Sequence, residues 1–159
     1  MYKLNDTVDR KMKAVIYKAL CESVIRYGVA LYGAAAQCHI QKINKLQKRC
    51  LETLFRRELQ AGLVNIYLEV RTLTPKNFYK FRMITEHVGS SQFKVENTKY
   101  QDRNLRRREK FKVQVPSTVF SERTLQFIIP TLYNQVPQNF NEQNVARFKT
   151  DIYNWLLLQ

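Results

Sequence analysis

The stretch that decides the fold runs from Ile40 to Arg57 and has the sequence IQKINKLQKRCLETLFRR. At about 100° per residue, its apolar residues fall within about 80° on one side of a helix, and its main cations within about 60° on the other side. The apolar residues are Ile43, Leu46, Cys50 and Leu54, and the cations are Lys42, Lys45, Arg49 and Arg56. The pattern predicts a helix that buries one flank and presents a basic ridge to its surroundings.

The preceding stretch, Val8 to Leu31, contains one glycine and no proline, which favours a first long helix. Large apolar residues recur along it at spacings of 4, 4, 3 and 4, as expected for the buried face of a helix. They are Ile16, Leu20, Val24, Tyr27 and Leu31. Gly33 and the three alanines that follow it mark either the end of this helix or a tight helix–helix junction. We expect the two long helices to pack as an antiparallel pair.

Further helices are expected up to a polar linker at residues 89–98. Leu63 to Val70 could form a short helix after Gly62. Thr74 and Pro75 have the sequence of an N-cap followed by a first-turn proline, and the helix they begin should run to about Val88. Its expected buried stripe is Phe78, Phe81, Ile84 and Val88. We place a boundary at the linker, between a helical bundle at residues 1–90 and a second region at residues 91–159.

The second region is expected to combine a basic loop, a small β-hairpin and a C-terminal helix. Val113 and Val115 alternate with polar residues, and Thr124 to Ile129 is a candidate partner strand. Pro130 to Val136 should form a short helix that Pro137 ends, and Asn141 should cap the last helix. The predicted class is therefore mainly α.

The charge balance points to an anionic partner. The chain has 27 lysines and arginines against 13 acidic residues, a formal net charge of +14, while its 45% apolar content is enough to build a core. Such an excess favours nucleic acid, and less often an acidic membrane surface. A protein that is merely basic and soluble is the plainer alternative.

A second group of cations lies between Lys99 and Lys112. Arg106, Arg107 and Arg108 stand near Tyr100 and Phe111, a combination that offers cations to phosphates and rings to unpaired bases. The alternative is a solvated charge run with both aromatic residues in the core. The candidate nucleic-acid-binding residues are Lys42, Lys45, Arg49, Arg56, Tyr100, Arg103, Arg106, Arg107, Arg108 and Lys110.

The sequence offers little that could carry catalysis. Its acids are scattered, without the close carboxylate pair that two-metal polymerases and nucleases need. Neither His39 nor His87 has partners at metal-ligand spacing, and four glycines are too few for a phosphate-binding glycine loop. The three cysteines form no CxxC pair, which suits reduced thiols in the cytoplasm or nucleus. We expect no metal, no cofactor and, since no apolar run approaches 18 residues, no membrane span.

Several stretches, taken together, resemble one family. They are Ile16 to Gly28 with Tyr32-Gly33, Leu46-Gln47-Lys48-Arg49-Cys50, Leu73 to Tyr79, Tyr100-Gln101-Asp102-Arg103, Pro130 to Pro137, and Phe148-Lys149 through Trp155-Leu156. In this order they are similar to the region that follows the polymerase palm in jockey-like and related LINE-type (non-LTR) retrotransposon reverse transcriptases. The resemblance covers about residues 10 to 157. The chain departs from the family pattern where Tyr32 and Tyr133 replace tryptophans and where Gln101-Asp102 replaces Asn-Thr.

This resemblance implies a thumb-like helical bundle with a C-terminal extension that holds template RNA or the primer–template duplex. The aspartates that bind metal in the family lie upstream, so it implies no catalysis by this chain alone and a catalytic part supplied separately. An intracellular location, nuclear or cytoplasmic, is expected from the three unpaired cysteines. The alternative is a protein-interaction domain of a domesticated or degenerate retroelement, which would dock a partner through apolar helix faces such as Val145, Phe148, Ile152 and Trp155.

Overall fold

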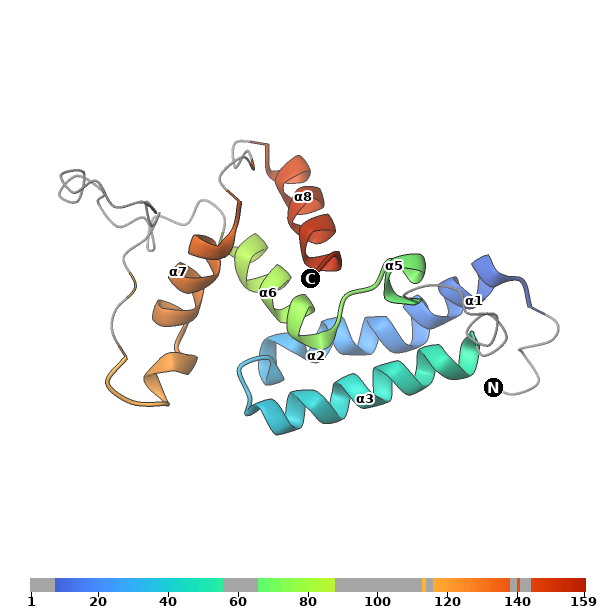
Figure 1. Ribbon diagram of the computed structural model, residues 1–159, viewed down its shortest axis with the longest axis horizontal. Coiled ribbons are helices and arrows are strands. Elements are labelled where there is room, and N and C mark those ends of the chain that lie inside the picture. The colour runs from blue at the N-terminus through green and yellow to red at the C-terminus, as the bar shows by residue number, and fades with distance from the viewer. Residues whose placement is uncertain (1–7, 56–65, 88–112, 114–115, 138–139, 141–143) are drawn as a thin grey trace. The chain divides into compact units, whose positions relative to one another are not determined.

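The computed structural model describes residues 8–55, 66–87, 113, 116–137, 140 and 144–159, and it is mainly helical, as predicted (Figure 1). In chain order the elements are α1 (Arg10–Tyr17), the π-helical turn η2 (Lys18–Glu22), α2 (Ser23–Tyr32), α3 (Gln37–Leu54), α5 (Ile66–Val70), α6 (Pro75–Glu86), the 3-10 turn η5 (Ser121–Arg123), α7 (Leu125–Gln135) and α8 (Val145–Leu157). The chain forms two units, Met1–Tyr79 with Trp155–Gln159, and Lys80–Asn154. The division predicted at residues 90/91 stays a prediction, since residues 88–112 lie outside the described part.

The first long helix is continuous from α1 to α2 but contains one wider turn. Asp9 begins it, accepting a hydrogen bond from the Arg10 backbone N–H at 2.7 Å. Within η2, the Ser23 N–H donates to the Lys18 carbonyl, five residues back instead of four. Tyr17 and Glu22, which are five residues apart, are both buried as a result. The helix thus shifts its buried face by one residue at this turn.

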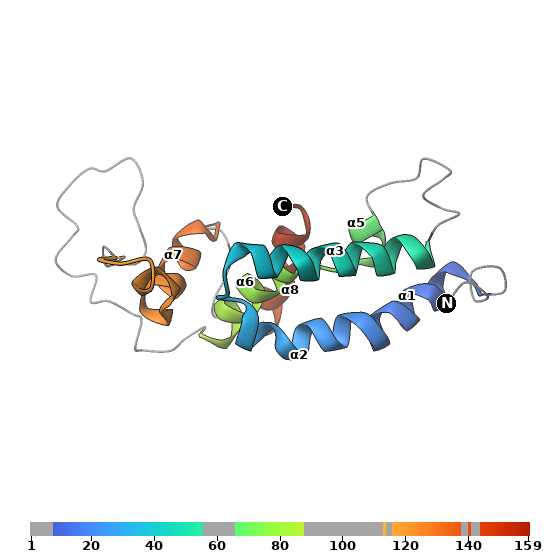
Figure 2. The same ribbon diagram turned by 90° about the horizontal axis from the view of Figure 1, so that it is seen from below.

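The predicted antiparallel pairing of the two long helices is confirmed. Figures 1 and 2 show the α1–α2 helix and α3 running side by side in opposite directions. The connection is tight, since the Ala35 N–H donates to the Tyr32 carbonyl at 2.9 Å. The ring of Tyr79 packs against Gly33, where an added Cβ would lie 2.0 Å from a ring carbon. Only glycine fits there without a shift of this ring.

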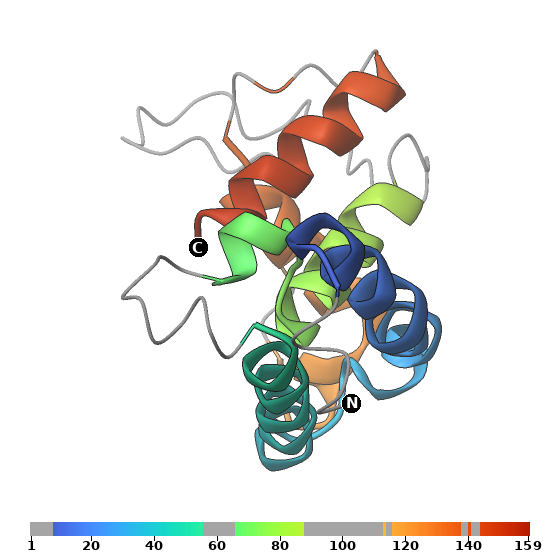
Figure 3. The ribbon, with the colours of Figure 1, turned by 90° about the vertical axis from the view of Figure 1, so that its right-hand side faces the viewer.

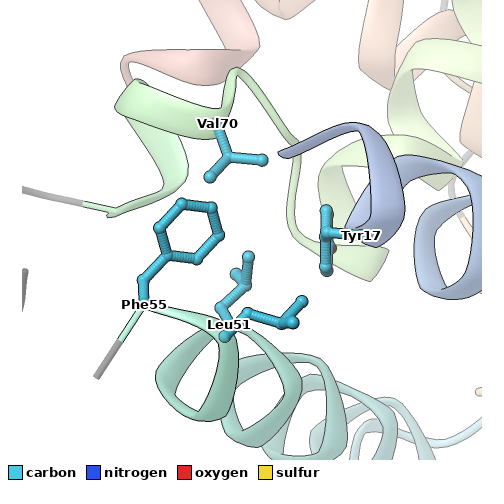
Figure 4. Close-up of a cluster of buried hydrophobic side chains, with 5 residues drawn as sticks. Tyr17, Leu51, Phe55 and Val70 are labelled. Atoms are coloured by element: carbon cyan, nitrogen blue, oxygen red, sulfur yellow. The ribbon is translucent and has the colours of Figure 1, made fainter. Parts of the chain in front are cut away.

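Near one end of the pair, α5 packs alongside both helices, as the end view of Figure 3 shows. Figure 4 shows Val70 of α5 directed toward Phe55 and Leu51 of the α3 end, with Tyr17 of α1 facing them. Leu54 completes this cluster, in which every side chain is at least 97% buried. Burying each such apolar side chain contributes about 1.5–3 kcal/mol, so the cluster is a main source of stability for the first unit.

A Schellman motif ends α5 and turns the chain toward α6. Arg71 has a φ of 52°, and the Thr72 and Arg71 N–H groups donate to the carbonyls of Tyr67 and Leu68. Thr74 then begins α6 as predicted, because its hydroxyl accepts a hydrogen bond from the Asn77 N–H at 3.3 Å.

A buried polar network ties α1, α3 and this turn together. The Gln47 side-chain amide donates to the Tyr17 hydroxyl and to the Leu73 carbonyl, both at 2.8 Å. The Tyr17 hydroxyl also lies 3.4 Å from the Thr72 hydroxyl. Burial raises the pKa of Tyr17 to about 12, and hydrogen bonds from Thr72 and Gln47 offset part of that rise.

The second unit is built from most of α6 and α8 together with α7. Phe81 and Tyr153 meet edge to face with ring centroids 5.5 Å apart. The Tyr133 hydroxyl donates to the Ile84 carbonyl at 2.9 Å, which fastens α7 to α6. Asn144 caps α8 by accepting from the Arg147 N–H at 3.1 Å. The predicted cap, Asn141, lies outside the described residues.

The predicted β-hairpin is wrong. Most of its second strand, Thr124 to Ile129, belongs to α7, and the described residues contain no strand. Apolar residues continue past Pro130 in a helical pattern, so that Ile129, Leu132, Tyr133 and Val136 are all buried. A single helix buries this whole set, whereas a strand ending at Ile129 would leave the short helix after it with little to pack against. Val113 is not in a strand, and Val115 lies outside the described residues.

The predicted buried faces of the two long helices are also wrong in part. Leu20, Val24, Tyr27 and Leu31 are exposed, and the first helix instead buries Lys13, Tyr17, Glu22, Ile25 and Val29. On α3 the buried residues are Ile40, Gln47, Leu51 and Leu54, while Leu46 is exposed. One reason is the wider turn η2, because a prediction that assumes 3.6 residues per turn throughout does not allow for it. Another is that Gln47 and Glu22 are buried polar residues, which a search for apolar side chains overlooks.

Candidate nucleic-acid interface

The face of α3 that points away from the core carries three exposed cations, Lys42, Lys45 and Arg49. We call these three residues the α3 ridge. At about 100° per residue they lie within about 60° of one another, directly opposite the buried face. The buried face observed in the structure is farther around the helix from the three cations than the predicted buried face. The separation of the basic face from the core is therefore clearer than the sequence predicted.

The ridge borders an open hollow of about 400 Å³ on the surface of α3. Its lining residues are Lys42, Lys45, Leu46, Lys48, Arg49 and Glu52. Lys48 makes an ion pair with Glu52 at 3.7 Å, so its charge is partly balanced. Leu46 is 60% exposed and gives the hollow an apolar patch. Sequence reasoning missed both Lys48 and Leu46, although the i, i+4 spacing of Lys48 and Glu52 was a usable signal for the ion pair.

The acids near the first unit's other cations are already engaged. Arg10 pairs with Glu69, and Arg26 pairs with Glu22 at 3.6 Å while its guanidinium lies 5.5 Å from the centre of the Phe78 ring. Among the residues that the structure describes, no carboxylate forms a salt bridge with Lys42, Lys45 or Arg49. The α3 ridge is thus a local surplus of positive charge, held on a rigid helix and facing solvent.

The other predicted site residues cannot be placed beside the α3 ridge. They lie outside the described part of the chain and are Arg56, Tyr100, Arg103, Arg106, Arg107, Arg108 and Lys110. Their role in binding stays a prediction.

The cysteines and histidines of the described residues are dispersed. Cys38 and His39 are exposed in the first turn of α3, and Cys21 and Cys50 pack against the core cluster of the first unit. Burial, and to a smaller extent contact with Cys50, raise the pKa of the Cys21 thiol to about 11. Within the described ranges, no three histidine, cysteine, aspartate or glutamate side chains are grouped as metal ligands would be. Nor does any helix there have the length and apolar content needed to cross a bilayer.

We also compared the chain with known proteins. No family model, no curated protein and no solved structure matches this chain.

Proposed function

We propose that this chain binds the phosphate backbone of RNA or DNA through the α3 ridge. The observation that supports this is the set of three exposed cations on one rigid helix face, without a salt bridge to any described acid. When lysine and arginine side chains on such a face contact a polyphosphate strand, they neutralise its phosphates, and the strand releases the counterions that were condensed on it. Contacts of this kind fix position and contribute affinity, with little preference for sequence.

We propose further that the chain is a non-catalytic part of a retrotransposon RNA-directed DNA polymerase. The motifs that resemble the post-palm region support this assignment, together with the long antiparallel helix pair that a thumb would need. In this proposal the ridge grips template RNA or primer–template duplex inside the cell, in the nucleus or cytoplasm. A separate chain or segment supplies the metal-binding aspartates.

The alternative docking face, by contrast, loses support from the structure. Of the four residues named for it, Phe148 and Ile152 are fully buried, Trp155 is partly buried and Val145 is 47% exposed. Side chains that already fill the core of a unit are not available to a partner.

Anisotropy titration of labelled RNA hairpin, RNA–DNA hybrid and single strand tests the binding proposal. Replacing Lys42, Lys45 and Arg49 together by glutamine should weaken binding roughly 30-fold near 0.15 M salt. The slope of the logarithm of the binding constant against the logarithm of the salt concentration should become less steep by about three. Glutamine keeps helix propensity close to that of lysine and arginine, so the fold should be retained.

The matched control carries the same loss of charge elsewhere. Lys11, Lys18 and Arg123 are exposed and lie outside α3, and their triple glutamine variant lowers the net charge by the same amount. It should weaken binding only about twofold to threefold, through the general field of the protein. Equal losses in the two triple variants would show that overall charge, not the α3 ridge, governs binding.

A further inference from the structure

The other helix of the pair, the α1–α2 helix, carries an apolar stripe on its outer face. Leu20, Val24, Tyr27 and Leu31 are 60%, 68%, 85% and 86% exposed, and we call them the outer stripe. Met12 and Val15 continue the exposed apolar surface along α1. Each of these side chains leaves on the order of 100 Å² of apolar surface in water, so the four residues of the outer stripe leave roughly 400 Å². A patch of roughly 400 Å² is as large as the largest apolar patch on a typical monomer, and the largest patch is often functional.

The composition of α2 supports the same conclusion. Its only charged residue is Arg26, which is already engaged by Glu22 and by the Phe78 ring. Its inner face is buried through Ile25 and Val29. A helix that is apolar on both its inner and outer faces is normally covered on both.

The spacing of the outer stripe identifies what fits on it. Successive residues are 4, 3 and 4 apart, which matches the a/d spacing of a coiled-coil seam along α2 from Val24 to Leu31, while Leu20 precedes them in the wider turn η2. That order is the same in either direction along the helix. An identical stripe running antiparallel would therefore place Leu20 opposite Leu31 and Val24 opposite Tyr27 of the other copy. The exposed small residues Ser23 and Ala30 beside the stripe allow two helices to approach closely.

The charges on this helix select the antiparallel arrangement. Lys11 and Lys18 are exposed near its beginning, whereas residues 27–33 contain no charged side chain. Parallel pairing would bring the lysines of two copies together. Antiparallel pairing instead sets each basic end against an uncharged one, which avoids that repulsion.

We propose that the outer stripe is a homodimer interface in which two copies pair antiparallel through Leu20, Val24, Tyr27 and Leu31. The interface is small, about half of the roughly 800 Å² per partner of a standard complex, so we expect a weak dimer that forms only at high protein concentration. It leaves the α3 ridge free, and it stands whether or not the ridge binds nucleic acid.

Sedimentation velocity of the whole chain between about 1 and 200 µM tests this proposal. The unaltered protein should shift from monomer to dimer across that range, with little dependence on salt. Val24→Glu and Tyr27→Glu, at exposed positions where folding should persist, should each weaken self-association at least about tenfold, since the substitution places a charge in an apolar seam. Gln41→Glu, at an exposed position on α3, is the matched charge control and should leave the Kd unchanged. A protein that stays monomeric at 200 µM, as it would if another protein or another part of this chain covered the stripe, overturns the proposal.

Disulfide trapping tests the direction of pairing. In a Cys38→Ser background, which removes the exposed thiol, Val24→Cys and Tyr27→Cys single variants are mixed under glutathione disulfide. Antiparallel pairing predicts a covalent dimer in the mixture at several times the yield of either variant alone. Higher yields from each variant alone, as parallel pairing would give, would contradict the proposed geometry.

Discussion

The two long helices of the first unit, the α1–α2 helix and α3, turn very different faces away from their shared core. The outer face of α3 carries Lys42, Lys45 and Arg49, while the outer face of the α2 region carries Leu20, Val24, Tyr27 and Leu31. A charged outer face is the ordinary state of a helix in water, whereas an apolar one is not. The contrast is the basis of our two proposals, which give the first surface a polyanion as partner and the other a second protein surface.

The inner faces of the same helices are alike, and this makes the comparison testable. Both combine apolar side chains with buried polar residues, which are Lys13 and Glu22 in one helix and Gln47 in the other. The network of Tyr17, Gln47 and Leu73 joins them. Changes on the inner faces should therefore act on folding, and changes on the outer faces should act on association.

The largest effect is expected where the register of an inner face is broken. Deleting Asn44, an exposed residue of α3, would turn Gln47, Leu51 and Leu54 by about 100° relative to Ile40. The core cluster could then not form. We expect a loss comparable with the whole stability of a small domain, about 5 kcal/mol or more, measured as loss of the cooperative transition in urea.

Deleting Ala19 is the matched control in the first helix. The turn η2 already spans five residues between Lys18 and Ser23, so removing one leaves an ordinary α-helical turn with Tyr17 and Ile25 still on one side. The expected cost is about 1 kcal/mol or less, since no buried contact changes. A loss as large as that of the Asn44 deletion would show that the wider turn is required for the fold.

A smaller effect is expected when the same substitution, leucine to alanine, is made on the inner face and on the outer face of α3. Leu51 is fully buried and Leu46 is 60% exposed. Leu51→Ala should lower the free energy of unfolding by about 3 kcal/mol, through lost burial and the cavity that remains. Leu46→Ala should lower it by less than about 0.5 kcal/mol. Urea denaturation of the two variants at one protein concentration checks this, and equal losses would contradict the assignment of faces.

The smallest effect is a pH dependence that arises from the burial of Tyr17. The pKa of Tyr17 is raised from 10.0 to about 12 in the folded protein, so its contribution to stability is complete below pH 10 and falls as the pH rises toward 12. The loss should reach on the order of 2 kcal/mol near pH 12. Burial also raises the pKa of Cys21 to about 11, which adds a fall that begins near pH 9.

The control for this pH dependence is Tyr17→Phe in a Cys21→Ala background. Urea unfolding of the background and of the double variant, measured at pH 8, 9.5 and 11, should show a shallower fall once Tyr17 is absent. Burial also raises the pKa values of Tyr32, Tyr67 and Tyr79, so part of the fall should remain. Identical slopes with and without Tyr17 would show that burial does not hold this side chain in its neutral form.

The α3 ridge could be predicted from the sequence, because the spacing of cations along a helix shows which of them share one face. Lys42, Lys45 and Arg49 recur at steps of 3 and 4, and their common face requires only that the segment be helical. The outer stripe was equally visible as a pattern, but its meaning was not. An apolar periodic face is ordinarily the buried one, and the structure places this one outside.

The sequence by itself determined the helical class, the two long helices and their antiparallel pairing, and the Thr74 start of α6, because periodicity, caps and short connections are local properties. Only the tertiary structure decided which faces are buried. The wider turn at η2 shifts the inner face of the first helix by one residue, and Gln47 is buried because Tyr17 and Leu73 supply its hydrogen-bond partners from distant parts of the chain. Hydrogen bonds of that kind depend on which helices meet, so no local pattern encodes them.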